Sequence, residues 1–280
     1  MLTASAIVAQ TDSLASVPAV YFHVKRVIDD PKGSIEQLAK AMATDPAMTA
    51  RVLRVVNSPF YGYPRRIDTI TRALNILGMQ QVHDLVLAWA ISGAFAGARP
   101  HALAMDGFWR ASVGRAIAAR ELARHARFVD AERLFVEGLL SDIGHLVMYT
   151  SRPDLALQAL QVSRETGRPL DQMERQIIGC DYAEVGAALV RAWQLPLTFE
   201  EPIRCQIQPE NASIHVLEAA ILHVAASMIE AAHWPVRLPC HPSAVAVLEV
   251  DEMTLTSVRT RMEAELASVL AIFFPNIAAA

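Results

Sequence analysis

The stretch from Leu134 to Tyr149, LFVEGLLSDIGHLVMY, restricts the fold of this chain more than any other segment. Its apolar residues recur at the 3.6-residue spacing of one helix face, so we predict a single continuous helix. Gly138, Ser141 and Gly144 are small, which lets the backbones of neighbouring helices come close. A helix this apolar lies at the centre of its domain, because other helices must cover its surface.

The rest of the chain is also patterned for helices. No alternation of polar and apolar residues indicates a strand, no internal repeat is present, and glycine is scarce at 12 of 280 residues. Apolar residues make up 53% of the chain, enough for a sizeable core. We therefore predict an all-α protein with two lobes: an N-terminal helical lobe over residues 1–98 and a helical bundle over residues 99–280. Gly97 to Pro100 marks the break between them.

Capping residues indicate where several helices begin and end. Ser34 and Gln37 form a capping box, Asp45 is a favourable N-cap, and Gly78 suits a C-terminal cap. The periodicity predicts helices over residues 18–28, 34–43, 46–56, 67–77, 79–95, 108–125, 134–149, 154–166, 170–178, 181–193, 199–206, 213–232 and 253–274.

Composition argues against several classes of protein. The most apolar run, residues 85–98, is shorter than the roughly 18–20 residues that span a membrane, and the N-terminus lacks the positive leader of a signal peptide. Three cysteines, Cys180, Cys205 and Cys240, are odd in number and far apart, which fits a reducing compartment. A net charge of −4 creates no general attraction to nucleic acid or to an anionic membrane. We expect a cytoplasmic protein that does not contact a membrane.

The segment from Ser34 to Ala90 contains an ordered series of motif residues. A DPAMT segment is followed by NSPFYG and then by a helical pattern that ends in Leu-Gly. In order, spacing and residue type this series resembles the HDOD family of bacterial HD-related output domains. The resemblance is dense over some sixty residues and continues less densely, covering about residues 15–226. The matching residues are Asp45, Pro46, Thr49, Asn57, Ser58, Tyr61, Gly62, Ile70, Ala73, Leu77 and Gly78.

The segment GLLSDIGHLVM resembles the GLLHDIGKL-type segment of HD phosphohydrolases. In that family a His-Asp pair and further ligands bind metal ions that activate water against a phosphate ester. Here the pair is Ser141-Asp142, and the other positions that the resemblance marks as ligands hold Ala111, Tyr182, Gln206 and Ala226. Only Asp142 remains, whereas about three protein ligands are needed to hold a catalytic cation. We expect an HD-type scaffold with no metal, no cofactor and no catalytic residue.

We interpret Asp142 and Asp84 as structural residues rather than catalytic ones. We expect Asp142 to accept hydrogen bonds from a neighbouring helix, because a buried carboxylate needs partners. His83 and Asp84 form a literal His-Asp pair, but they lie in the first lobe, where the resembling family has no metal site. We expect them to be a polar pair on a helix face.

A hydrolase-type triad can also be drawn from the central stretch. Glu137, Ser141 and His145 follow one another at four-residue steps along the predicted helix. A working triad needs a nucleophile on a strained turn and an oxyanion hole, and one helix face supplies neither. The sequence therefore disfavours this alternative.

A cluster of arginines and tyrosines surrounds the connector at residues 57–64. Five arginines in 22 residues are opposed only by Asp68, a pattern typical of a solvated face or of a site for phosphate, carboxylate or a partner protein. We expect Phe60 to point inward, and we predict partner binding by Arg51, Arg54, Tyr61, Tyr63, Arg65 and Arg66, with Arg72 as the fifth arginine. The short helices nearby loosely resemble a helix-turn-helix, but the acidic chain lacks a polar recognition helix, so DNA binding is disfavoured.

The family resemblance implies a role in signal transduction. The 280 residues contain no sensor, receiver or cyclase domain, so we expect this chain to act in trans on a signalling protein, or to bind a nucleotide or phosphorylated ligand. One alternative is a metal-dependent phosphohydrolase or nucleotide-binding enzyme with an altered HD site. A DNA-binding regulator is a further alternative.

Overall fold

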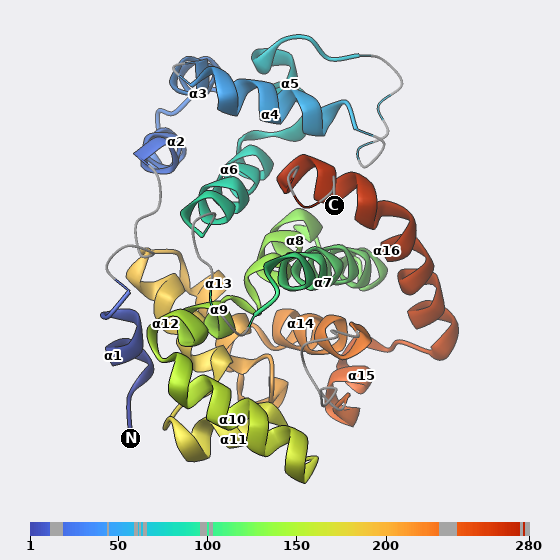
Figure 1. Cartoon of the computed structure of the whole chain (residues 1–280). Coiled ribbons are helices and arrows are strands. Elements are labelled where there is room, and N and C mark those ends of the chain that lie inside the picture. Colours follow the sequence, from blue (N-terminus) through green and yellow to red (C-terminus); the bar gives the residue numbers. More distant parts are fainter. Residues whose placement is uncertain are drawn as a thin grey trace. The chain divides into compact units, whose positions relative to one another are not determined.

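The computed structural model describes residues 1–11, 19–43, 45–58, 61, 63, 66–95, 100, 103–229, 240–274 and 277. Within these residues every regular element is a helix and none is a strand (Figure 1), which confirms the all-α prediction. None of the helices found there is both long and apolar enough to cross a membrane.

The helices group into two compact units. Unit 1 comprises Met1–Ser16 and Gly97–Ala264, and unit 2 comprises Val17–Ala96 and Glu265–Ala280. Each unit combines segments that are far apart in the sequence, and the two continuous lobes over residues 1–98 and 99–280 stay a prediction. Long-range packing joins the N-terminus to unit 1, since the Leu2 amide donates to the Ile178 carbonyl over 2.8 Å.

Unit 1 is built around α7 (Met105–His125), in which every residue from Ala111 to Ala123 is buried. Figure 1 shows α8 and α14 beside α7, and both pack against it. The remaining elements of this unit are α1 (Ala4–Val8), α8 (Ala131–Leu140), α9 (Ile143–Ser151), α10 (Pro153–Thr166), α11 (Leu170–Ile177), α12 (Tyr182–Ala192), α13 (Leu197–Cys205), the 3-10 turn η1 (Pro209–Asn211), α14 (Val216–Met228) and α15 (Pro242–Leu248). The sequence patterns did not predict α1 or α15.

Two glycines allow close helix packing in unit 1, as expected. A Cβ on Gly138 would lie 2.8 Å from the Arg115 carbonyl oxygen, so α8 approaches the backbone of α7 directly. A Cβ on Gly144 would overlap the Tyr182 carbonyl oxygen, so α9 approaches α12 in the same way. Any larger residue at these positions would force the helices apart.

The prediction of one helix over residues 134–149 is wrong. The chain leaves α8 after Leu140 and begins α9 at Ile143, with Ser141 and Asp142 in the turn between them. In a continuous helix the His145 amide would donate to the Ser141 carbonyl. It donates to the Asp142 carbonyl instead, over 3.1 Å, and the Ser141 carbonyl accepts from the Gln206 side-chain amide over 2.7 Å. A tertiary hydrogen bond therefore replaces the helical one.

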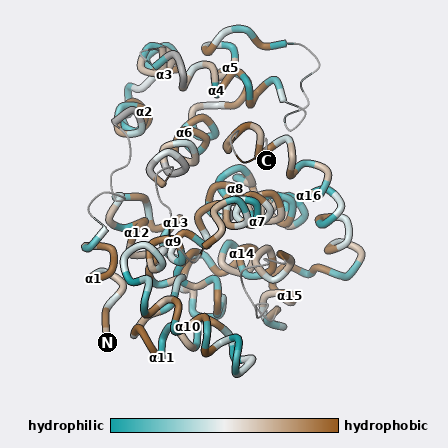
Figure 2. The backbone as a smooth tube through the Cα atoms, in the orientation of Figure 1, coloured by the Kyte–Doolittle hydropathy of each residue, from teal (hydrophilic) through white to brown (hydrophobic). Residues whose placement is uncertain are grey.

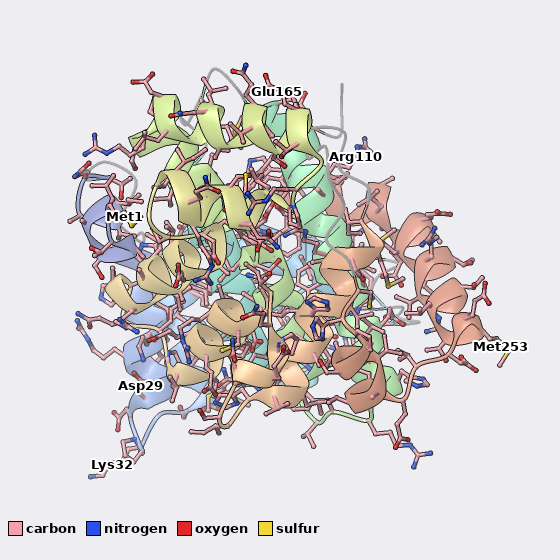
Figure 3. All side chains as sticks on the ribbon, turned by 90° about the horizontal axis from the view of Figure 1, so that it is seen from below. Met1, Asp29, Lys32, Arg110, Glu165 and Met253 are labelled. Carbon is pink, nitrogen blue, oxygen red and sulfur yellow. The ribbon has the colours of Figure 1, made fainter. Side chains whose placement is uncertain are left out.

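Unit 2 contains α2 (Ala19–Asp29), α3 (Ile35–Ala43), α4 (Pro46–Val56), α5 (Ile70–Leu77) and α6 (Met79–Ala94). The predicted caps are present. The Ser34 hydroxyl accepts from the Gln37 amide, the Asp45 carboxylate accepts from the Met48 amide, and Gly78 ends α5 with φ +84°. The side chains of Asp29 and Lys32, around the turn between α2 and α3, point outward (Figure 3).

The last helix, α16 (Glu252–Phe273), contributes residues to both units. Hydrophilic and hydrophobic residues alternate along it (Figure 2), and Met253 in its first turn is 77% exposed and projects from the helix (Figure 3). In unit 2 the Phe273 ring stacks on Trp89 of α6 at 5.4 Å between centroids. This stack ties the C-terminal part of α16 to α6.

Candidate functional site

The turn between α8 and α9 brings together the residues that replace an HD-type centre. Asp142 is fully buried there, and its Oδ1 lies 2.9 Å from Arg115 Nη1 of α7 and 2.6 Å from His145 Nδ1 of α9. Asp142 thus has partners on two helices, as expected for a buried carboxylate. The sequence reasoning did not single out Arg115, although a charged residue inside the apolar centre of α7 is a usable signal for a buried partner.

His145 lies between two carboxylates. Its Nε2 is 3.1 Å from Glu174 Oε1, while its Nδ1 faces Asp142. Burial alone would lower the pKa of His145, but Glu174 and Asp142 outweigh it and raise the pKa to about 9. His145 is therefore an imidazolium at neutral pH, and the cluster contains two cations facing two carboxylates.

Glu174 and Tyr182 close the remaining sides of His145. The second oxygen of Glu174 accepts from the Tyr182 amide over 3.0 Å, and burial raises the pKa of its carboxyl. The Tyr182 ring stacks on the His145 ring with centroids 4.1 Å apart and planes 14° apart. We call Arg115, Asp142, His145, Glu174 and Tyr182 the buried charge cluster.

The other altered positions contribute no metal-binding group to this cluster. Gln206, at the end of α13, uses its amide nitrogen on the Ser141 and Ile203 carbonyls. Ala111 and Ala226 are buried on α7 and α14, two helices that pack together. The altered positions Ala111, Ser141, Tyr182, Gln206 and Ala226 are therefore all buried, and their correspondence to ligand positions stays a prediction.

The residues present do not fit a metal ion. A cation beside Asp142 would have to displace Arg115 and His145, which already supply positive charge at that carboxylate. Among the residues that the structure describes, no group of three or more His, Cys, Asp or Glu side chains is placed to hold a metal. The chemistry of this donor set gives no support to a metal-activated water.

The two competing constellations have other roles. Ser141 Oγ donates to the Gly138 carbonyl over 2.8 Å, and His145 is engaged by carboxylates, so the hypothetical triad with Glu137 is not assembled. In unit 2, His83 bonds Asp84 through Nδ1 over 2.9 Å and Tyr21 of α2 through Nε2 over 3.2 Å.

The bond from His83 to Tyr21 connects α6 to α2, and both His83 and Asp84 are buried. The sequence predicted a polar pair on a helix face, but the packing of α2 against α6 covers the pair.

Three of the six residues predicted to bind a partner line a pocket inside unit 2. Arg54, Tyr63 and Arg66 line it, whereas Arg51 is exposed on α4 outside its lining. The Tyr61 and Tyr63 rings stack in parallel, with centroids 6.3 Å apart. Arg65 and Phe60 lie outside the described residues, so their predicted positions stay predictions.

We call this cavity the arginine pocket. Its volume is about 1030 Å³, and the second half of α16 forms a wall that the sequence reasoning did not anticipate. The lining residues are Ala50, Leu53, Arg54, Asn57, Ser58, Tyr63, Arg66, Ile67, Asp68, Ser268, Ala271 and Ile272.

Comparison with known sequences and structures identifies related proteins. The family model described as "HDOD domain" matches residues 14–209. An uncharacterised protein of Treponema pallidum is 21% identical over 197 residues, which covers 69% of this chain and 37% of that protein. The chain therefore matches little more than a third of this curated relative.

Solved structures share the fold over nearly the whole chain. An HDOD domain protein of unknown function from Geobacter sulfurreducens is 23% identical, with a TM-score of 0.69 over 94% of this chain and 91% of that one. A Shewanella amazonensis protein provisionally named a phosphohydrolase is 25% identical, with a TM-score of 0.70 over 92% and 93%. A Marinobacter aquaeolei protein provisionally named a signal transduction protein is 21% identical, with a TM-score of 0.69 over 96% of this chain and 61% of that one.

Proposed function

This chain belongs to the HDOD domain family, and on that premise we propose that it is a non-catalytic regulatory protein in signal transduction. It binds a signalling protein or a small anionic ligand in trans and turns over no substrate. The provisional name of the Marinobacter protein supports a signalling context.

The observation that carries this proposal is the pairing inside the buried charge cluster. Arg115 and protonated His145 supply the positive charge that a metal ion would otherwise supply beside Asp142. Building such a cluster from side chains requires each charge to have a partner, and the geometry provides one for each. This pairing supports a structural role for Asp142 in place of a metal-binding one.

Metal-dependent phosphohydrolysis is the second candidate function. The provisional name of the Shewanella protein and the retained Asp142 favour it. DNA binding is a weaker alternative, because the net charge of the chain is −4, and it would appear as a salt-sensitive gel shift.

Elemental analysis and a phosphodiesterase assay distinguish these functions. We expect protein purified without chelators to carry no stoichiometric metal and to leave bis(p-nitrophenyl) phosphate intact when Mn²⁺ is added. The matched control is Asp142→Asn, which removes the charge and keeps the shape. A stoichiometric Fe, Mn or Zn content, or a turnover, that disappears in Asp142→Asn would overturn the proposal.

A further inference from the structure

The arginine pocket has a rigid mouth. Asn57 Nδ2 donates to the carbonyls of Leu53 and Ile67, each over 2.7 Å, and its Oδ1 accepts from the Ile67 amide over 2.7 Å. The two bonds to Ile67 fasten the residues after the connector to the end of α4, and the bond to Leu53 fixes the Asn57 side chain on that helix end. They hold Arg54 and Arg66 at the same opening without using either guanidinium.

The two arginines carry unneutralised positive charge. Neither Arg54 nor Arg66 has an ion-pair partner within the described part of the chain, and both are exposed. A planar guanidinium donates two parallel hydrogen bonds to a phosphate, and two of them at one opening suit a phosphate group. Asp68, also in the lining, is a hydrogen-bond acceptor for hydroxyl groups and disfavours a second anion beside it.

An aromatic face and an apolar wall complete the pocket. Tyr63 is 40% exposed and its ring is parallel to that of Tyr61, within 5°. Such a ring is a platform on which a planar base stacks. Leu53 and Ile67 from the first part of unit 2 and Ile272 from α16 supply apolar surface to the same pocket.

We propose that the arginine pocket binds a nucleoside phosphate. The phosphate lies between Arg54 and Arg66, the base stacks on Tyr63, and the sugar hydroxyls face Asp68. The volume of about 1030 Å³ admits such a ligand, since small-molecule sites commonly measure about 300–1,000 Å³. This inference rests on the proposed function, for which it names the class of anionic ligand.

Isothermal titration calorimetry in the presence of EDTA tests the inference. The probes are AMP, GMP, CMP and UMP, with inorganic phosphate and adenosine as the two halves of the ligand. We expect at least one mononucleotide to bind saturably, and each half to bind about tenfold more weakly or less, because each uses only part of the pocket. Circular dichroism checks that every variant is folded.

The variants separate this pocket from general electrostatics. Arg54→Ala with Arg66→Ala should weaken nucleotide binding by about tenfold or more, whereas Lys32→Ala with Lys40→Ala, the same charge change on exposed residues of unit 2 outside the lining, should change it less than about twofold. Tyr63→Ala should weaken binding, and Tyr63→Phe, which keeps the ring, should not.

Four results would overturn the inference: no saturable binding of any mononucleotide, phosphate binding as tightly as the nucleotides, equal losses in the two double variants, or equal affinities for Tyr63→Ala and Tyr63→Phe. Failure of the proposed function looks different. If the bound nucleotide is converted in a parallel incubation with Mn²⁺ in place of EDTA, the non-catalytic proposal fails while the pocket inference stands.

Discussion

At the scale of single residues, the buried charge cluster shows how one substitution constrains its neighbours. With Ser141 in place of the His of a His-Asp pair, Asp142 still needs a positive partner in an apolar centre. Arg115 reaches it from α7 and His145 reaches it from one turn along α9. The burial of Asp142, Arg115 and His145 is explained by their proximity, because each charge has an opposite charge beside it.

Replacing Asp142 tests this dependence. Asp142→Ala should lower the free energy of unfolding by about 3 kcal/mol, because it leaves Arg115 and His145 as buried cations without that carboxylate. Urea denaturation measures the change. The control Glu263→Ala, at an exposed position on α16, should shift the free energy by less than about 0.5 kcal/mol. A midpoint for Asp142→Ala equal to that of the control would contradict a stabilising role.

The pKa of His145 predicts how stability depends on pH. Its folded pKa of about 9 exceeds the unfolded value of about 6.5, so its contribution is fully present below pH 6.5 and is lost as pH rises toward 9. The total loss is about 3 kcal/mol, with a maximal slope near 1.4 kcal/mol per pH unit. Burial also raises the pKa of Asp181, to about 7, so its contribution falls in the same direction but mostly below pH 7.

Urea midpoints recorded between pH 7 and 8.5 follow the histidine together with the Glu174 carboxyl that it contacts, whose pKa burial also raises. Burial raises the pKa of the Cys180 thiol to about 12, so the loss of stability linked to this thiol lies mostly above this range. His145→Gln removes the titrating group, so its free energy of unfolding should vary much less with pH over the same interval. A variant slope equal to the wild-type slope would show that another group is responsible.

At the scale of elements, close backbone contacts decide which helices are neighbours. α8 packs on α7 through Gly138 and α9 packs on α12 through Gly144. Because a turn separates α8 from α9, each of these two helices can orient independently against the helix on which it packs. The Gln206 side-chain amide stabilises this break, because it donates a hydrogen bond to the Ser141 carbonyl.

A pair of glycine substitutions tests the packing of α9. Gly144→Ala should destabilise the protein by about 3 kcal/mol or more, since the added Cβ overlaps backbone of α12. Gly93→Ala is the matched control, because a Cβ at Gly93 of α6 meets no atom within 4 Å. Alanine is the better helix former, so the control should be neutral or stabilising by up to about 1 kcal/mol. Thermal or urea denaturation of both variants gives the comparison, and equal effects would refute close packing at Gly144.

At the scale of the whole molecule, each end of the chain belongs to a unit whose other residues are far from that end in the sequence. The C-terminal part of α16 joins unit 2, where Phe273 stacks on Trp89 and Ala271 and Ile272 line the arginine pocket. The first residues join unit 1, where Ile7 is completely buried.

Shortening the C-terminus tests the role of α16 in unit 2. Deleting residues 265–280 should speed amide hydrogen exchange in α6 by about tenfold or more, because it exposes the Trp89 side of that helix. Deleting only residues 275–280 retains Phe273 and should leave exchange in α6 unchanged. Protection of α6 that survives the longer deletion would show that unit 2 does not need this segment.

The local features were predictable because they depend on neighbours in sequence. Helical periodicity identified the all-α class, and Ser34, Asp45 and Gly78 were correctly identified as caps, since a cap bonds backbone groups only three or four residues away. The small residues of the central stretch predicted close packing for the same reason: a missing side chain is visible in the sequence itself.

The remaining features depended on contacts between distant segments. Nothing between residues 134 and 149 reveals that the Ser141 carbonyl is bonded by Gln206, 65 positions later, so the break in the helix escaped prediction. Arg115 and Glu174 likewise acquire their partners only when α7, α9 and α11 come together. The sequence by itself determined the all-α class and the helix caps, whereas tertiary structure decided which charges meet, because burial and pairing energies arise only once the chain has packed.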